Sequence, residues 1–205
     1  MTKILLLNSS PRGDSVSTKV ANELVAKIRS NSKGSTLVER DLTKDVLPHI
    51  GEAFVVGSRI DADKRSKAQQ AAVEISDKLI KEVANADTLV IASPMFNFGP
   101  ATTLKAWFDY ILRAGVTFKY TEKGPEGLLT GKKVYVVVAR GGIYSAGPMK
   151  AIDFQEPYLR HLLGFAGMTD ITFVKVEGIA YGPEAAEKAV RAALDSIPEM
   201  LAKAA

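Results

Sequence analysis

Residues 3–10 read KILLLNSS, an apolar run that ends abruptly in a loop of small polar residues. The same succession returns at residues 88–91, followed by a loop over 93–100, and at residues 134–138, followed by a loop over 140–148. Aliphatic and β-branched runs that alternate with helical patterns are typical of parallel strands covered on both faces. All strands of such a sheet end on the same side. We therefore expect the first loop (8–17), the second loop (93–100) and the third loop (140–148) to form one ligand site.

The rest of the chain completes an alternation of strands and helices. Apolar stripes predict helices that begin after the first loop, near residues 68, 101 and 154, and at Pro183, and further strands lie at 36–40 and 171–176. Five strands and five helices predict one α/β domain over residues 1–205. Its doubly wound parallel sheet has the strand order 2-1-3-4-5, with helices on both faces.

Two segments interrupt this alternation. Residues 41–65 are longer than a usual connection between a strand and a helix and carry an apolar patch at 54–56, so we expect a lid or a subunit contact, the alternative being a surface insertion without a role. Residues 115–131 contain two aromatic side chains, Phe118 and Tyr120, and a turn signal at Gly124-Pro125. Neither segment is predicted to form a helix or a strand.

The composition limits the possible chemistry. The chain has no cysteine and two histidines without a second ligand at helical spacing, so we expect no metal site, and redox chemistry would need an organic cofactor. The 27 basic and 23 acidic residues are mixed along the sequence, which indicates a solvated surface and no nucleic-acid partner. Without a targeting pattern or an apolar run of about 20 residues, we expect a cytoplasmic protein with no membrane contact.

The first loop has the residues of an anion site. It supplies several hydroxyl groups, one guanidinium group and main-chain N–H groups at the start of a helix, an arrangement suited to a phosphate monoester. One of these hydroxyls also fits the ordinary role of a helix N-cap. The pattern Gly-x-Gly-x-x-Gly is absent after the first strand, which argues against a dinucleotide bound in the Rossmann manner.

The second and third loops have features that suit a flat ring. Pro94 and Pro100 stiffen the second loop, Gly99 allows close approach of the backbone, and Asn97 offers a donor and an acceptor. Arg140, Gly141 and Gly142 pair a cation with glycines that let N–H groups reach a ligand, the alternative being a tight turn that needs positive φ.

A phosphate pocket beside a pocket for a flat ring has the outline of a site for flavin mononucleotide (FMN). At this point the sequence resembles the family of FMN-dependent NADH:quinone oxidoreductases and azoreductases over nearly its whole length. The blocks that carry the resemblance include residues 94–98, 113–118, 124–128, 140–142 and 177–183. One departure is a first loop that is a residue shorter than in some relatives. Another is Phe96, where tyrosine is common.

The resemblance implies a flavodoxin-like homodimer with FMN at the subunit interface and NADH or NADPH as the electron donor. It implies ping-pong two-electron reduction of quinones and reductive cleavage of azo compounds. The residues that it assigns to the cofactor are Ser10, Ser15, Val16 and Ser17 for the phosphate, Pro94, Met95, Phe96, Asn97 and Phe98 for the ring, and Ala139, Arg140, Gly141 and Gly142 for the far edge of the ring.

Substrate contacts are predicted at four side chains. Phe98, Phe118 and Tyr120 are candidates for walls that enclose planar substrates, with ordinary packing as the alternative. Arg59 could favour anionic substrates, although a single arginine in a loop is more often solvated. Because main-chain donors can stabilise the charge of a reduced flavin, no acid–base residue is assigned.

Two other functions compete with this interpretation. Gly13-Asp14-Ser15-Val16 imitates the nucleophile block of Gly-Asp-Ser-Leu esterases, but no histidine follows His161, and a serine without a base is a poor nucleophile. A flavodoxin-type electron carrier would share the cofactor loops without reacting with NADH. Such carriers tend to be acidic and to lack large insertions, whereas this chain is basic and has two.

Overall fold

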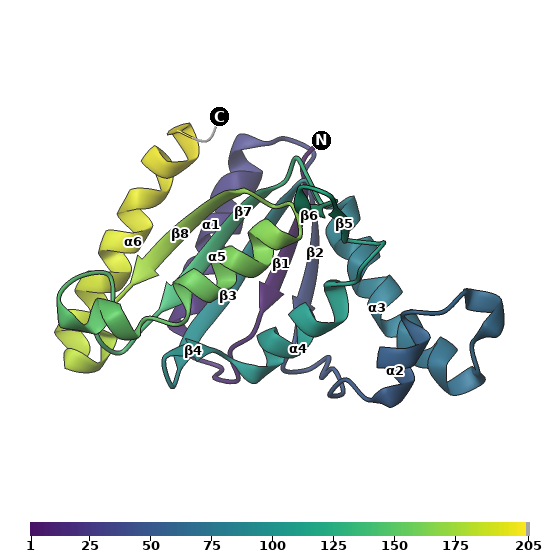
Figure 1. Ribbon diagram of the computed structural model, residues 1–205. Helices are drawn as coiled ribbons and strands as arrows, with labels where there is room; N and C mark the ends of the chain where they lie inside the picture. Colours follow the sequence, from purple (N-terminus) through teal and green to yellow (C-terminus); the bar gives the residue numbers. More distant parts are fainter. Residues whose placement is uncertain (204–205) are drawn as a thin grey trace.

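The central element of the computed structural model, which describes residues 1–203, is a parallel sheet (Figure 1). Its five parallel strands lie in the order β2-β1-β3-β7-β8. Their bounds are Lys3–Asn8 (β1), Thr36–Asp41 (β2), Thr88–Phe96 (β3), Lys133–Ala139 (β7) and Asp170–Val176 (β8). Counted along the chain, this is the order 2-1-3-4-5, so the predicted topology is confirmed.

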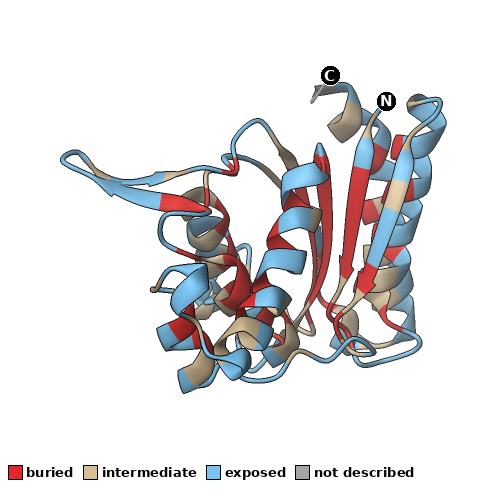
Figure 2. Ribbon diagram, turned by 90° about the vertical axis from the view of Figure 1, so that its right-hand side faces the viewer, coloured by how far each residue is buried: buried red, intermediate tan, exposed pale blue. Residues whose placement is uncertain are grey.

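Helices cover both faces of the sheet, as predicted. On one face, α1 (Val16–Asn31) and α6 (Pro183–Lys203) contribute side chains to the core that also contains Ile4 and Leu6 of β1. The opposite face carries α3 (Lys67–Asn85), α4 (Thr102–Ile111) and α5 (Glu156–Phe165), which pack around Leu5 and Leu7. Successive residues of a strand point to opposite faces, so the continuous apolar run of β1 serves both cores. Figure 2 shows the buried strands between the two helical layers.

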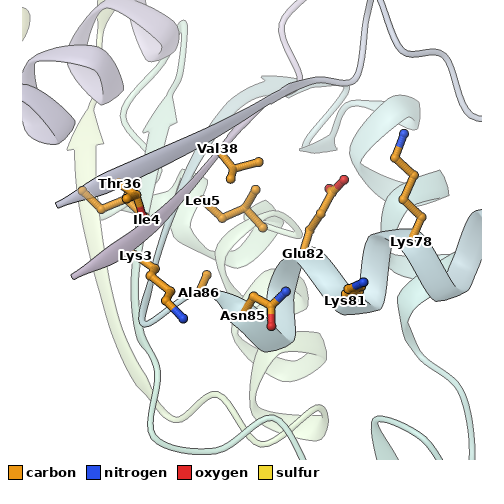
Figure 3. A pocket seen from close by; sticks show the side chains of 10 residues that line it. All are labelled: Lys3, Ile4, Leu5, Thr36, Val38, Lys78, Lys81, Glu82, Asn85 and Ala86. Atoms are coloured by element: carbon orange, nitrogen blue, oxygen red, sulfur yellow. The ribbon is translucent and has the colours of Figure 1, made fainter. Parts of the chain in front are cut away.

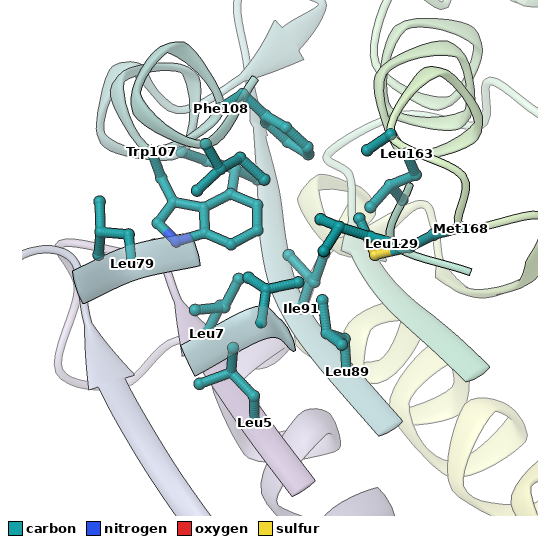
Figure 4. Close-up of a cluster of buried hydrophobic side chains, with 14 of the residues drawn as sticks. Leu5, Leu7, Leu79, Leu89, Ile91, Trp107, Phe108, Leu129, Leu163 and Met168 are labelled. Carbon is teal, nitrogen blue, oxygen red and sulfur yellow. The ribbon is translucent and has the colours of Figure 1, made fainter. Parts of the chain in front are cut away.

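The larger core is built around α4. Trp107 and Phe108 are almost completely buried, with ring centroids 5.0 Å apart in an edge-to-face arrangement. They lie above Leu7 of β1 and Ile91 of β3 (Figure 4). Each such side chain contributes about 1.5–3 kcal/mol through burial. This packing fixes the amino-terminal end of α4 beside the ends of β1 and β3, where Thr103 donates a hydrogen bond to the Ser9 carbonyl (3.2 Å).

The segment 41–65 is more regular than the sequence indicated. It contains a helix, α2 (Glu52–Gly57), and a 3₁₀ turn, η1 (Ala62–Lys64). The Phe54 ring is buried against Tyr110 of α4, with centroids 4.7 Å apart. The prediction of an irregular segment was therefore wrong for residues 52–57. Phe54 thus anchors this short helix to α4, far away in the sequence, and the buried Gly57 lies against Gln69 of α3.

The segment 115–131 forms an antiparallel hairpin of β5 (Phe118–Thr121) and β6 (Gly124–Gly127), which the sequence did not predict. The hairpin projects from the body of the molecule (Figure 2). Its base is fixed where Gly127 lies against Gly167, so closely that a Cβ on Gly127 would come within 2.0 Å of the Gly167 nitrogen. Within residues 1–203, no helix combines the length and apolar character that crossing a bilayer requires.

Candidate functional site

The three loops meet at the carboxyl edge of the sheet, where the arrowheads of the strands point in Figure 1. Strand register fixes this convergence: Asn8 lies beside Ala92 on β3, and Pro94 lies beside Ala139 on β7. Hydrogen bonds then join the first loop to β3 and the second loop to Phe154, since the Ser9 side chain donates to the Ala92 carbonyl (2.7 Å) and the Phe154 amide donates to the Phe98 carbonyl (3.1 Å). The predicted gathering of segments 8–17, 93–100 and 140–148 at one edge is therefore present.

The first loop presents buried hydroxyl groups at the start of α1. Ser15 is the N-cap of this helix and accepts a hydrogen bond from the Thr18 amide (3.3 Å), and its hydroxyl lies 3.0 Å from that of Ser17. Ser10 is also buried. In helix geometry the amides of Val16 and Ser17 have no carbonyl partner within the helix. Ser15 thus serves both as the cap and as part of a group of neutral donors.

Asn8 organises this loop, a role that the sequence analysis missed. Its side-chain oxygen accepts hydrogen bonds from the Thr18 hydroxyl (2.7 Å) and the Ser10 amide (3.3 Å), which ties the end of β1 to the first turn of α1. The signal in the sequence was an amide side chain directly after an apolar run. The guanidinium group of Arg12, in contrast, pairs with Asp14 at the exposed tip of the loop (2.8 Å).

The second loop is a tight hairpin. β3 continues to Phe96 and turns through Asn97 and Phe98 into β4 (Gly99–Pro100). Asn97 and Phe98 have positive φ values of 45° and 70°, the sign that a two-residue type I′ turn needs. Positive φ is unfavourable for a phenylalanine by about 1–2 kcal/mol, and such strain concentrates at functional sites. A Cβ added at Gly99 would come no closer than 3.9 Å to another atom of the chain, so the fold itself does not require glycine there, and its close approach to a ligand stays a prediction.

Aromatic side chains of this hairpin are available to a ligand. Phe96 and Phe98 are each 42% exposed. Phe98 also packs edge-to-face on Tyr144 of the third loop, with ring centroids 6.3 Å apart. The hairpin thus carries two half-exposed flat surfaces at the edge where the loops meet.

The third loop presents main-chain donors. The carbonyls of Arg140, Gly141 and Gly142 accept hydrogen bonds of 3.0–3.3 Å from the amides of residues 178–180. A trans peptide places its N–H group opposite its carbonyl, so the N–H groups of Gly141, Gly142 and Ile143 point away from residues 178–180. Neither Gly141 nor Gly142 has a positive φ, so the alternative of a tight turn that needs positive φ is wrong.

The Arg140 side chain does not supply the expected cation to a ligand. It is fully buried, and its guanidinium group contacts Asp153 (3.0 Å), Glu177 (3.0 Å) and the Gln155 side chain (3.1 Å). Two carboxylates more than offset its charge. The expectation of a free cation at this edge is therefore wrong, and Arg140 can reach a ligand only through its backbone.

Glu177 is a second residue that the sequence analysis missed. Burial alone would raise the pKa of its carboxyl group, but hydrogen bonds from Ser145, Tyr144 and Arg140 together lower this pKa below its ordinary value. Asn8 is the last residue of β1 and Glu177 comes directly after β8, so both stand at the carboxyl end of a strand. A search for polar residues at the carboxyl ends of strands would have found both.

A cavity of about 600 Å³ opens between the first loop, the hairpin and the start of α4. Its lining includes Ser9, Phe96, Asn97 and Thr103. This volume lies within the usual range for small-molecule sites, about 300–1,000 Å³.

The four predicted substrate residues do not lie together. Arg59, Phe118 and Tyr120 line a different cavity of about 620 Å³ between α2, the end of α4 and β5, whereas Phe98 lies on the hairpin. Phe118 is buried against Phe165 (4.4 Å between centroids), and Tyr120 is 74% exposed. Within one copy of the chain, these side chains do not form walls on either side of a single ring.

Another cavity, of about 310 Å³, lies beside α3 and the edge strand β2 (Figure 3). Lys3, Lys78 and Lys81 surround its apolar floor, and Glu82 in its wall pairs with Arg40. None of the predicted site residues lines it.

Comparisons with known proteins agree with this geometry. Residues 2–201 match a family model described as a flavodoxin-like fold. The FMN-dependent NADH:quinone oxidoreductase 1 of Rhizobium etli is 50% identical over 200 residues, which cover 98% of each chain. The FMN-dependent NADH:quinone oxidoreductase of Agrobacterium fabrum is 50% identical over 201 residues, also with 98% of each chain covered.

Solved structures show the same similarity. An azoreductase from Bacillus anthracis superposes with a TM-score of 0.90 at 32% identity, with 98% of each chain covered. An FMN-dependent NADH-azoreductase from the same species, solved in complex with FMN, superposes with a TM-score of 0.86 at 28% identity, with 98% of this chain and 99% of that chain covered.

Proposed function

This chain belongs to the flavodoxin-like family of FMN-dependent NADH:quinone oxidoreductases and azoreductases, and from that premise we propose that it reduces quinones and azo compounds with electrons from NADH. The observation that carries the proposal is the convergence of a buried hydroxyl loop, an aromatic hairpin and a row of main-chain donors at one edge of the sheet. FMN, when bound, supplies the redox chemistry by taking up a hydride and passing on two electrons.

The residues present fit FMN. The first turn of α1 carries no acidic residue that would repel a phosphate, and its N-terminus offers hydroxyl and amide donors. We assign the phosphate to Ser10, Ser15, Val16 and Ser17. The ring is assigned to residues 94–98, and its far edge to the backbone of residues 139–142.

The chain's own groups then perform two tasks. Phe96 and Phe98 offer flat apolar faces on which planar groups can stack, which orients a reacting pair without a charged side chain. The N–H groups of Gly141, Gly142 and Ile143 stabilise negative charge that develops at the ring edge, and because they are fixed in advance they need no reorganisation during reaction. The protons that the reduced quinone or azo group takes up come from solvent in this scheme, so no side chain is assigned to proton transfer.

The protein works as a homodimer with FMN at the interface, and this part of the proposal explains the separated substrate residues. The apolar surface at the carboxyl edge includes Phe154 and Tyr181, which are 61% and 66% exposed in a single chain. A second copy over this edge would cover them. It would also bring a cavity lined by Arg59, Phe118 and Tyr120 toward the flavin of the first copy. Light scattering of the purified protein tests the dimer, and a monomer at micromolar concentration would contradict it.

An anaerobic titration tests the function. The purified yellow protein is mixed with NADH and then with a quinone while flavin absorbance is followed. Bleaching by NADH and recovery with the quinone are expected. A colourless protein would contradict the assignment, and a flavin that only a protein partner reduces would identify an electron carrier. Because NADH is a cytoplasmic donor, we propose the cytoplasm as the site of action.

A further inference from the structure

The network around Arg140 extends beyond an ordinary ion pair. Gln155, also fully buried, accepts a hydrogen bond from Arg140 and donates to both oxygens of Ser93 at the end of β3 (3.0 and 3.1 Å). Asp153 accepts from the amides of Gln155 and Glu156 (3.0 and 3.1 Å), at the start of α5. One guanidinium group thus links the ends of β3, β7 and β8 to α5.

The Glu177 carboxylate binds both ends of the segment 140–145 in the third loop. One carboxylate oxygen accepts from the Arg140 guanidinium group (3.0 Å), the Tyr144 amide (2.9 Å) and the Ser145 amide (3.0 Å). The other oxygen accepts from the Ser145 hydroxyl. The three donors at residues 141–143 lie between these attachment points. The Glu177 side chain is 11% exposed, so its hydrogen bonds are largely shielded from water.

We propose that Glu177 is a positioning residue, whose carboxylate fixes residues 140–145 so that the N–H groups of Gly141, Gly142 and Ile143 point at the edge of the flavin ring. The inference rests on the proposed function, because it assigns those donors to FMN. Glu177 acts through the loop and does not itself touch the cofactor. Arg140 pairs with this carboxylate behind the loop, and the groups that meet the ring are neutral main-chain amides.

Two substitutions separate the geometry of Glu177 from its charge. Glu177→Ala removes every attachment, whereas Glu177→Gln retains a carbonyl oxygen that can accept from Arg140, Tyr144 and Ser145. The matched control is Glu156→Ala. Glu156 also forms two ion pairs, with Arg160 and Lys175, and its side chain is 18% exposed, but its carboxylate does not bind the third loop.

The test measures binding of FMN and of riboflavin, which lacks the phosphate, to each apoprotein by quenching of flavin fluorescence. Circular dichroism first establishes that each apoprotein is folded. For Glu177→Ala we expect affinity for both ligands to fall by the same factor, about tenfold or more, because charge-assisted hydrogen bonds that fix the loop are lost. Glu177→Gln should stay within about threefold of the wild type, and Glu156→Ala should bind as the wild type does.

A second readout is the reduction potential of the bound flavin. Glu177→Gln and Glu177→Ala remove the same charge from the network around Arg140, so a difference in potential between them reports the position of the loop donors. The alanine variant also releases the loop, and its donors then stabilise the negative charge of reduced flavin less, so its potential should lie below that of Glu177→Gln. A merely structural role for Glu177 would leave the two potentials equal.

Four results would overturn the inference: a Glu177→Ala protein that binds both ligands like the control, one that loses affinity for FMN alone, a Glu177→Gln protein as weak as the alanine variant, or equal reduction potentials in the two variants of Glu177. If Glu177→Ala does not fold, Ser145→Ala removes one donor at an exposed position, and it should weaken both ligands by about threefold. An unchanged affinity there would equally overturn the inference. A wild type that binds neither flavin would instead refute the proposed function.

Discussion

The first and third loops lie at the same edge of the sheet, yet they are built by opposite means. In the first loop, neutral side chains point inward, and the charged pair of Arg12 and Asp14 stays in solvent. The third loop has its charges buried, with Arg140 fully enclosed between two carboxylates, and presents only backbone to a ligand.

The difference follows from what each loop is proposed to bind. A phosphate brings its own charge and many acceptor oxygens, so neutral hydroxyls and the start of a helix are sufficient. A neutral ring edge needs donors at fixed positions, and a loop with two glycines is flexible unless other groups hold it. We infer that buried charge in the third loop provides rigidity and that neutral donors in the first loop provide affinity.

The largest expected effect is on the free energy of unfolding, when Arg140 at the centre of the buried network is replaced. Arg140→Met leaves the carboxylates of Asp153 and Glu177 without their partner and should lower the free energy of unfolding by about 3–5 kcal/mol. The same change at Arg12, in the exposed pair, should leave the free energy of unfolding nearly unchanged, because solvent screens an exposed ion pair. Urea denaturation of both apoproteins measures this. Equal losses at the two sites would break the contrast between the loops.

The second-largest expected effect is on the affinity for FMN, which tests whether the first loop binds the phosphate. Ser17→Ala removes a buried hydroxyl from the first loop and should weaken FMN binding by about 10- to 100-fold, since a hydrogen bond to a charged group contributes about 1.5–3 kcal/mol. Riboflavin, without a phosphate, should bind as to the wild type. Ser30→Ala, at an exposed position of the same helix, is the control. A parallel loss of riboflavin affinity would show that the first loop contacts more than the phosphate.

A smaller effect concerns the helix cap. Ser15→Ala should lower the free energy of unfolding of the apoprotein by about 1 kcal/mol, because Ser15 caps α1. Thermal unfolding in the absence of flavin is the measurement. An unchanged stability would mean that the hydroxyl serves the ligand alone.

The smallest expected effect is a dependence of the free energy of unfolding on pH, which should arise from Glu177 at the third loop and not from the first loop. The pKa of Glu177 is lowered in the folded protein, so its stabilising contribution is complete above the unfolded pKa, about 4.3, and is lost as the pH falls toward the folded value. The difference in unfolding free energy between the wild type and Glu177→Gln should therefore shrink as the pH falls below about 4.3 and through the lowered pKa of the folded protein. For Ser15→Ala the difference should remain constant, because a hydroxyl does not titrate there. A constant difference for Glu177→Gln would contradict this assignment.

Much of the fold could be read from the sequence, because apolar runs and helical stripes record burial directly. The hairpin at 118–127 and helix α2 could not be predicted. Short polar strands and a six-residue helix carry little periodicity, and their stability depends on distant contacts such as that of Phe54 with Tyr110.

The sequence predicted the position of the site more accurately than the roles of its residues. The carboxyl ends of the strands located all three loops correctly, since parallel topology brings them together. The role of the Arg140 side chain was wrong because its partners, Asp153 and Glu177, lie 13 and 37 residues further along the chain. Whether an arginine faces a ligand or a buried carboxylate is decided by tertiary structure, which spacing alone does not reveal.

The most direct test of the account is an NMR titration of the ¹⁵N-labelled apoprotein, first with FMN and separately with riboflavin. The amide signals of Gly141, Gly142 and Ile143 should shift with both ligands, while those of Val16 and Ser17 should shift strongly with FMN alone. Amides at 141–143 that do not respond to FMN, or signals at 16–17 that respond equally to riboflavin, would contradict the division of the site into a phosphate loop and a ring-edge loop.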